Sequence, residues 1–103
     1  MTGAVAFIPD LMDRSRLGSR PVELVGSLDQ LATAAVGASL VLVDLARPGA
    51  LEIAGALVAA GTRVVGFAPH VDDELRGAAT GVGVEVVTRS WFFGHLHDLI
   101  PPA

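Results

Sequence analysis

Carboxylates follow two of the most apolar segments of this chain, where they are placed to hold a cation or to accept a transferred group. Asp10 comes just after the apolar residues 4–8, Asp13 lies about one helical turn further on, and Asp44 lies near the end of the apolar run 40–45. Mg²⁺ is usually held by one or two carboxylates together with water. The three acids therefore predict either a Mg²⁺ site with Asp10 and Asp44 as its ligands, or a salt-bridged cluster without a ligand.

Two later apolar runs also end at polar residues. Residues 64–68 lead to His70, and residues 84–87 lead to Arg89 and Ser90. His70 is either a ligand or base or simply the start of a helix, and Ser90 is best interpreted as the N-cap of the last helix. The predicted cleft is lined by Asp10, Asp13, Asp44, Ala68, His70, Arg89 and Ser90.

The elements that position these residues alternate along the chain. Four short apolar runs rich in β-branched residues predict strands at 4–8, 40–45, 64–68 and 84–87, and a fifth strand is predicted at 22–25. Between them lie segments with helical periodicity. The resulting alternation of strand and helix predicts an α/β fold, with a mostly parallel sheet covered by helices on both faces.

Charged residues in the strands predict the strand order. Glu23 interrupts the second strand and Glu85 the fifth, whereas the other three strands are uncharged. Buried central strands of a parallel sheet are apolar throughout, and charges suit the edges. We therefore expect the order 2-1-3-4-5, which is that of a flavodoxin-like three-layer sandwich.

Capping and stop signals set the expected helix boundaries. Ser27 and Gln30 have the spacing of a capping box, so we expect a helix from this point to Gly37. The expected helices span residues 11–17, 28–37, 48–61, 71–82 and 90–100.

These features together resemble a response-regulator receiver domain over essentially the whole chain. Phe7-Ile8-Pro9-Asp10 matches the acidic end of the first strand, and Leu42-Val43-Asp44 matches the strand that carries the phosphate-accepting aspartate. Val86-Val87-Thr88-Arg89-Ser90-Trp91 matches the end of the fifth strand. The resemblance implies that Asp44 occupies the phosphoacceptor position, that Asp10 occupies a metal-ligand position, and that Arg89 replaces the family's lysine.

Departures from the receiver pattern indicate a divergent, pseudo-receiver type of domain. A single acid, Asp10, stands where the family has a pair, and Ala68 replaces a hydroxyl residue. Arg89 replaces a compact ammonium with a planar, forked guanidinium, which we expect to pair with Asp44. Ser90 replaces a proline. These losses predict that Asp44 is not an efficient phosphate switch.

Composition excludes several classes of function. The 103 residues predict one domain spanning 1–103, and the absence of cysteine excludes disulfides and thiolate zinc sites. The seven basic residues are scattered in a chain of net charge −4, so we expect no nucleic-acid partner. The longest uncharged stretch, 30–43, is too short to cross a membrane, and the first ten residues lack the basic region of a signal peptide. We expect a cytoplasmic protein.

The predicted function is that of a stand-alone, non-enzymatic signalling module of the two-component type, recognised by a partner protein. One alternative is a phosphoacceptor that uses Asp44 with Mg²⁺ and Arg89 as its phosphate clamp. Another is a small-molecule binder or enzyme at the same cleft, which rests on fold analogy alone. Residues 50–60 form a helix that is apolar on most sides, so we also expect a homodimer with exposed Leu51, Val58 or Trp91 as contacts.

Overall fold

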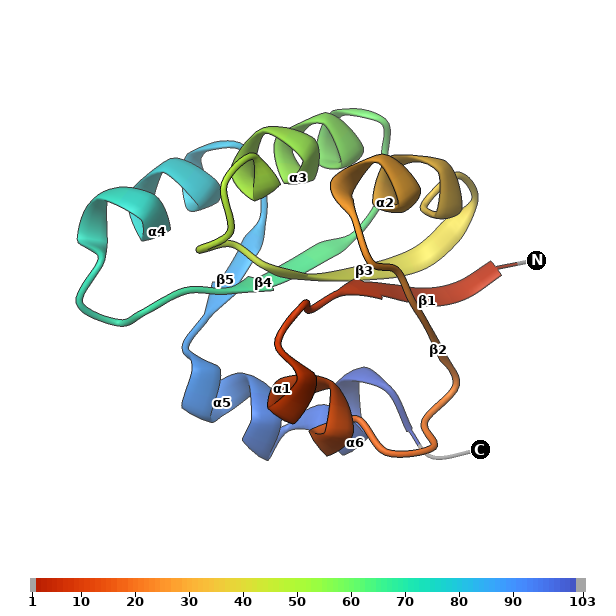
Figure 1. Ribbon diagram of the computed structural model, residues 1–103. Coiled ribbons are helices and arrows are strands. Elements are labelled where there is room, and N and C mark those ends of the chain that lie inside the picture. The colour runs from red at the N-terminus through yellow and green to blue at the C-terminus, as the bar shows by residue number, and fades with distance from the viewer. Residues whose placement is uncertain (1, 102–103) are drawn as a thin grey trace.

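The computed structural model describes residues 2–101, in which five parallel strands form one sheet (Figure 1). The strand order is β2-β1-β3-β4-β5, which confirms the predicted flavodoxin-like arrangement and places Glu23 and Glu85 on the two edge strands. The strands are β1 (Thr2–Phe7), β2 (Val22–Leu24), β3 (Ala38–Asp44), β4 (Val64–Phe67) and β5 (Glu85–Val87).

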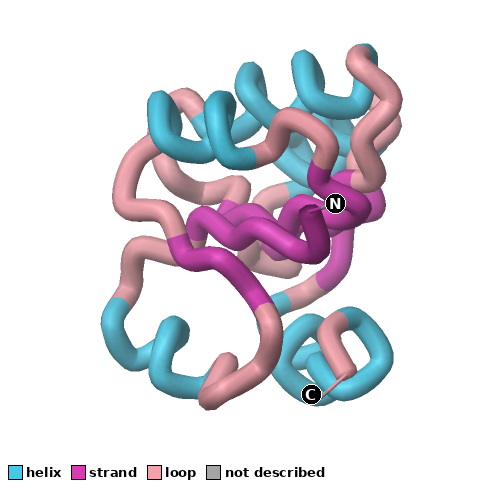
Figure 2. The backbone as a smooth tube through the Cα atoms, turned by 90° about the vertical axis from the view of Figure 1, so that its right-hand side faces the viewer, coloured by secondary structure: helices cyan, strands magenta, loops and turns pink. Residues whose placement is uncertain are grey.

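Helices cover both faces of the sheet and complete the three layers (Figure 2). Helices α2, α3 and α4 lie on one face, and α1, α5 and α6 lie on the other (Figure 1). Within residues 2–101, no helix has the length and apolar character needed to cross a membrane. The helices are α1 (Leu11–Arg16), α2 (Leu28–Ala34), α3 (Ala50–Ala59), α4 (Asp73–Gly81), α5 (Arg89–Gly94) and α6 (Leu96–Leu99).

Strand β3 lies at the centre of the sheet and contributes to a core on each face. Its side chains alternate, so that Val41 and Val43 pack beneath α2, α3 and α4, whereas Leu40 and Leu42 pack toward α1, α5 and α6. All four are buried. Burial on both sides explains why β3 is apolar up to its last residue, Asp44, which then lies at the carboxyl edge of the sheet.

The N-caps of two helices test the predicted start signals. The Gln30 backbone N–H donates to Ser27 Oγ at 3.1 Å, which confirms the predicted N-cap of α2. The prediction for Ser90 is wrong, because the N-cap of α5 is Thr88, whose Oγ1 accepts from the Trp91 backbone N–H at 3.1 Å. Thr88 is still extended while Ser90 is already helical, so the helix begins before the residue that was expected to cap it.

All five predicted helices are shorter or divided in the structure, and the last two show why. The single helix expected over residues 90–100 is divided into α5 and α6 at His95, whose backbone φ of −121° is not helical. The helix expected from residue 71 begins at Asp73, because the side chain of Asp72 accepts from the Leu75 backbone N–H and caps it.

Helix α3 is covered by more than the sheet, because α2 and α4 flank it on the same face (Figure 1). Leu51 and Val58 are half-buried and pack against the core. Val58 also lies over the chain at Gly83, where an added Cβ would come within 2.8 Å of Val58 Cγ1. These two residues are therefore less exposed than expected, because neighbouring helices account for the apolar sides of α3, and their role as contacts between copies stays a prediction. Trp91, by contrast, is 41% exposed.

Candidate functional site

A charged pocket of about 490 Å³ opens at the carboxyl edge of the sheet, where the strand ends meet the start of α1. Asp10 N-caps this helix, since its Oδ1 accepts from the Asp13 backbone N–H at 3.0 Å. Four of the seven predicted cleft residues come together here. The pocket is lined by Asp10, Met12, Asp13, Ser15, Arg16, Asp44, Arg47 and Arg89.

A bidentate ion pair between Asp13 and Arg89 dominates the pocket. Arg89 Nη2 donates to Asp13 Oδ1 at 2.6 Å, and Nη1 donates to Oδ2 at 2.8 Å. The hydrogen bonds from Arg89 hold the pKa of the Asp13 carboxyl below its usual value, against the opposing effect of burial. The same hydrogen bonds raise the pKa of Arg89. The predicted pairing of Arg89 with Asp44 is therefore wrong.

The position of Arg89 explains why it reaches Asp13. It is the first residue of α5, on the face of the sheet that α5 shares with α1. Its guanidinium lies 5.4 Å from the Phe67 ring centroid and 5.5 Å from that of Phe93. These buried aromatic rings support the guanidinium from beneath, so that it faces the N-terminal half of α1. The pair joins residues that are 76 positions apart in the sequence.

Asp44 is held by its own loop. It is 7% exposed, and its Oδ1 accepts from the Ala46 backbone N–H at 3.1 Å. Its Oδ2 lies 3.4 Å from Arg47 Nε, so the nearest cation comes from three residues further along the chain. The sequence analysis missed Arg47, although its spacing after the candidate aspartate was a usable signal.

The remaining predicted residues line a neighbouring pocket of about 390 Å³. Ala68 is fully buried there, whereas His70 and Ser90 are exposed. Arg89 is the residue that lines both pockets. The single predicted cleft is therefore two adjacent hollows, because the side chain of Arg89 lies between the strand-one acids and the end of β4.

A second arginine fastens the start of the site. Arg14 Nε donates to the Ile8 carbonyl oxygen at 2.8 Å, and its Nη2 donates to the Val25 carbonyl oxygen at 2.8 Å. Arg14 thereby joins the chain that follows β1 to the chain that follows β2. Sequence reasoning did not find this role, because the two carbonyl groups come together only in the folded chain.

Two of the three carboxylates of the pocket already face arginine side chains, whereas Asp10 has no ion pair within residues 2–101, so the Mg²⁺ site with Asp10 and Asp44 stays a prediction. Both oxygens of Asp13 accept from Arg89, and those of Asp44 face Ala46 N–H and Arg47. Within residues 2–101, no three histidine, aspartate or glutamate side chains are grouped as a metal site. A cation at Asp13 or Asp44 would have to displace the guanidinium group that already neutralises that acid.

Leu11 and Met12 form an exposed apolar rim on the α1 side of the charged pocket. Leu11 and Met12 are 78% and 79% exposed at the start of α1, and Met12 also lines the pocket. Arg16, from the last turn of α1, stacks over the Phe93 ring at 4.2 Å from its centroid. The site thus combines a neutralised charged floor with an exposed apolar rim.

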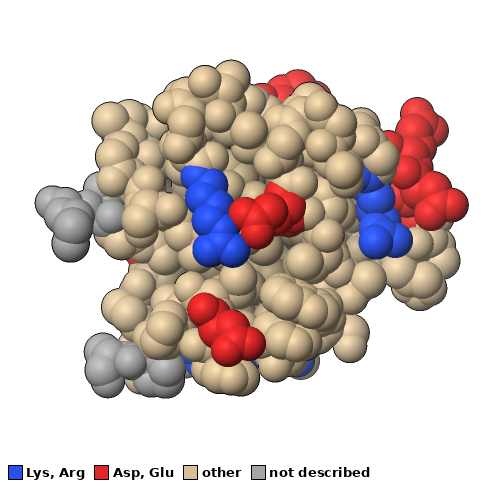
Figure 3. Space-filling model, turned by 180° about the vertical axis from the view of Figure 1, so that it is seen from behind, with Lys and Arg blue, Asp and Glu red and all other residues tan. Residues whose placement is uncertain are grey.

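The face of the molecule that is turned by 180° from the view of Figure 1 carries few charges (Figure 3). Basic side chains there are scattered over uncharged surface and lie beside acidic ones (Figure 3). This face therefore offers no basic patch of the kind that binds nucleic acid.

No family model matches the chain, and no match to a curated protein was found.

Proposed function

We propose that this chain is a cytoplasmic, receiver-like signalling module that acts by binding another protein, with no phosphoryl transfer to Asp44. The observation that carries the proposal is the bidentate Arg89–Asp13 pair, with contacts of 2.6 and 2.8 Å. This pair keeps the Asp13 carboxylate permanently bound to the guanidinium of Arg89. An arginine bound in this way is a stronger and more rigid partner than lysine.

The surroundings of Asp44 also support a module without phosphoryl transfer. Transfer to an aspartate depends on positioning and on neutralising the charge of the phosphoryl group. Here Arg89 is engaged with Asp13, and the buried residue at the end of β4 is Ala68, whose methyl group donates no hydrogen bond. A phosphoryl group on Asp44 would lack both contacts that receivers use.

The apolar rim supports the binding role. Two adjacent large apolar side chains, Leu11 and Met12, are nearly four-fifths exposed beside the pocket. Exposed apolar groups gathered at a hollow are typical of surfaces that bind other proteins. The partner protein that fits this site would place an apolar side chain against Leu11 and Met12 and direct a polar group into the pocket.

The phosphorylation half of the proposal is tested by incubating the protein with Mg²⁺ and acetyl phosphate or beryllofluoride. We expect no mass increase in intact-mass spectra and no change in Trp91 fluorescence. An Ala68→Ser/Arg89→Lys variant serves as the matched control, because it restores the receiver-type residues and should be labelled. Stoichiometric labelling of the unaltered protein, abolished by Asp44→Asn, would instead assign it as a phosphoacceptor.

The binding half is tested by placing a photo-cross-linking residue at position 12 in the producing cells. We expect a discrete cross-linked protein that is lost with Leu11→Ser. Val36 provides the control position. It is 78% exposed, close to the 79% of Met12, but it lies just before β3, at the amino ends of the strands and away from the pocket. Equal cross-linking from both positions, or none from position 12, would contradict a binding role for this rim.

A further inference from the structure

The two edge strands of the sheet carry a glutamate each, but only one of them is neutralised within the chain. On β5, Glu85 accepts two hydrogen bonds from Arg63, at 2.7 and 3.0 Å. On β2, Glu23 is exposed and has no hydrogen bond or ion pair with any residue in the range 2–101. The edges are thus electrostatically different, although both glutamates suit an edge position.

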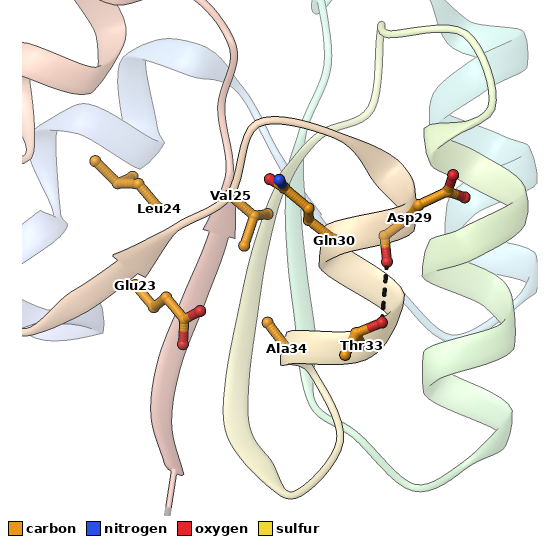
Figure 4. Close-up of a pocket in the computed structure, with 7 residues that line it drawn as sticks. All are labelled: Glu23, Leu24, Val25, Asp29, Gln30, Thr33 and Ala34. Atoms are coloured by element: carbon orange, nitrogen blue, oxygen red, sulfur yellow. Dashed lines mark hydrogen bonds between the residues drawn. The ribbon is translucent and has the colours of Figure 1, made fainter.

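The unpaired glutamate lines a groove of about 590 Å³ between β2 and α2. Figure 4 shows Glu23 on β2 and Val25 just after it, with Gln30 and Ala34 directed toward them from α2. The Asp29 carboxylate points away from the strand (Figure 4). Glu23 and Asp29 both line the groove, and Glu23 is the acid on its strand side.

The backbone of β2 is open at Leu24, whereas the outward-facing donors on either side of it are engaged: the Val22 N–H donates to the Arg20 carbonyl oxygen at 2.8 Å, and the Gly26 N–H donates to Gln30 Oε1 at 2.7 Å. The Val25 N–H donates to the Ala6 carbonyl oxygen at 3.0 Å, so the backbone groups of Val25 face β1. Successive residues of a strand direct these groups to opposite sides, so the N–H and C=O of Leu24 face outward. The Leu24 side chain is 40% exposed. An edge with free donors and acceptors is a template for an added strand.

We propose that the β2 edge binds an extended peptide segment that carries an arginine or lysine, whose cation pairs with Glu23. Backbone hydrogen bonds to Leu24 would align the segment, and an alternate apolar side chain would lie in the groove beside Val25. The β5 edge lacks the corresponding charge, because Arg63 already neutralises Glu85. This inference is independent of the function proposed for the charged pocket.

A second copy of this chain fits the β2 edge less well. Antiparallel pairing of two β2 strands about Leu24, whose backbone groups face outward, would place Glu23 opposite Val25 of the other copy and leave its charge without a cation. A β5 edge from another copy would bring Glu85, whose cation is already engaged. A separate basic partner therefore supplies the missing charge more directly than a second copy paired through β2 or β5.

The test uses the ¹⁵N-labelled full chain and a capped peptide, Val-Thr-Arg-Thr-Val, added in an NMR titration. We expect shifts of the backbone amides in the segment from Val22 to Val25 and at Thr33. A peptide with glutamate in place of arginine, and one with N-methylated threonines, should both produce no shifts. Loss with N-methylation separates strand addition from a purely ionic contact.

Protein variants isolate the contribution of Glu23. Glu23→Gln should weaken binding about fivefold, because it removes one solvent-exposed ion pair. Glu52→Gln is the matched control, since Glu52 is an exposed glutamate on α3, and this variant should bind as the unaltered protein does. The proposal is overturned if millimolar peptide causes no shifts, if the shifts lie at Asp10–Arg16, or if Glu23→Gln binds equally well. A dimer that depends on β2 would also overturn it, in favour of self-pairing.

Discussion

Replacing Arg89 with methionine leaves the buried carboxylate of Asp13 without its partner. The Asp13 side chain is 6% exposed, while that of Arg89 is 46% exposed. Breaking a fully buried ion pair costs about 3–5 kcal/mol, and an exposed pair contributes about 0.2–1 kcal/mol. Because only the acid is buried here, we expect Arg89→Met to lower the free energy of unfolding by about 2 kcal/mol. That loss corresponds to a Tm decrease of roughly 10 °C.

The loss should depend on pH in a defined direction. With Arg89 present, the pKa of Asp13 lies below its usual 3.8, so its stabilisation is complete above about pH 4 and disappears as pH falls through the folded-state pKa. Without Arg89, burial raises the pKa of Asp13, and only the more distant Arg16 and Arg47 oppose this. The stability difference between the two proteins should therefore be largest near pH 7 and should shrink as the pH approaches 3.

Urea unfolding followed by circular dichroism at a series of pH values measures this difference. Arg63→Met is the matched control, because Arg63 and Glu85 form an equally bidentate pair whose side chains are 53% and 52% exposed. We expect this control to lose less than about 1 kcal/mol. If Arg89→Met and Arg63→Met lower the free energy of unfolding equally at neutral pH, the burial of Asp13 does not make the Arg89–Asp13 pair more stabilising than the exposed Arg63–Glu85 pair.

Four other substitutions test the packing and helix capping of the fold. Gly66→Ala should destabilise the fold by about 1–3 kcal/mol in urea unfolding, because its Cβ would lie 2.6 Å from Leu45 Cδ1. Gly77→Ala is its control on α4, where an added Cβ meets nothing within 4 Å, and it should stabilise the fold by about 0.5–1 kcal/mol. Phe92→Ala should lower the free energy of unfolding by about 3–5 kcal/mol, since the ring is fully buried; a loss below 1 kcal/mol would contradict its place in the core. Asp72→Ala should cost about 1 kcal/mol in the same assay by removing the N-cap of α4, and an unchanged midpoint would contradict that role.

The fold could be predicted because its signals are local and repeated. Each central strand is an unbroken apolar run, and the glutamates at positions 23 and 85 mark the two edges. Capping at Ser27 was likewise readable, because the groups that meet are three residues apart. The prediction of Ser90 as the N-cap failed because Thr88, two residues earlier, also has a hydroxyl group that can cap the helix. The sequence alone does not show which of the two residues is the cap.

Pairing within the site was beyond the sequence. The acids and Arg89 were predicted to meet because parallel strands end at one edge, and they do line one pocket. Which acid takes the guanidinium depends on the face of the sheet that carries α1 and α5, and on the support from Phe67 and Phe93. Those contacts join residues far apart in the chain, so no spacing rule contains them.

The surface followed the same division. The apolar pattern of α3 was visible in the sequence, but whether its outer residues meet solvent depended on where the neighbouring helices lie. Helices α2 and α4 occupy the same face of the sheet, and they cover Leu51 and Val58. Hydrophobic periodicity along a chain determines which residues must be buried, since removal from water stabilises them wherever it occurs. Only the tertiary structure decides what buries them, and which charges, like that of Glu23, are left without a partner within residues 2–101.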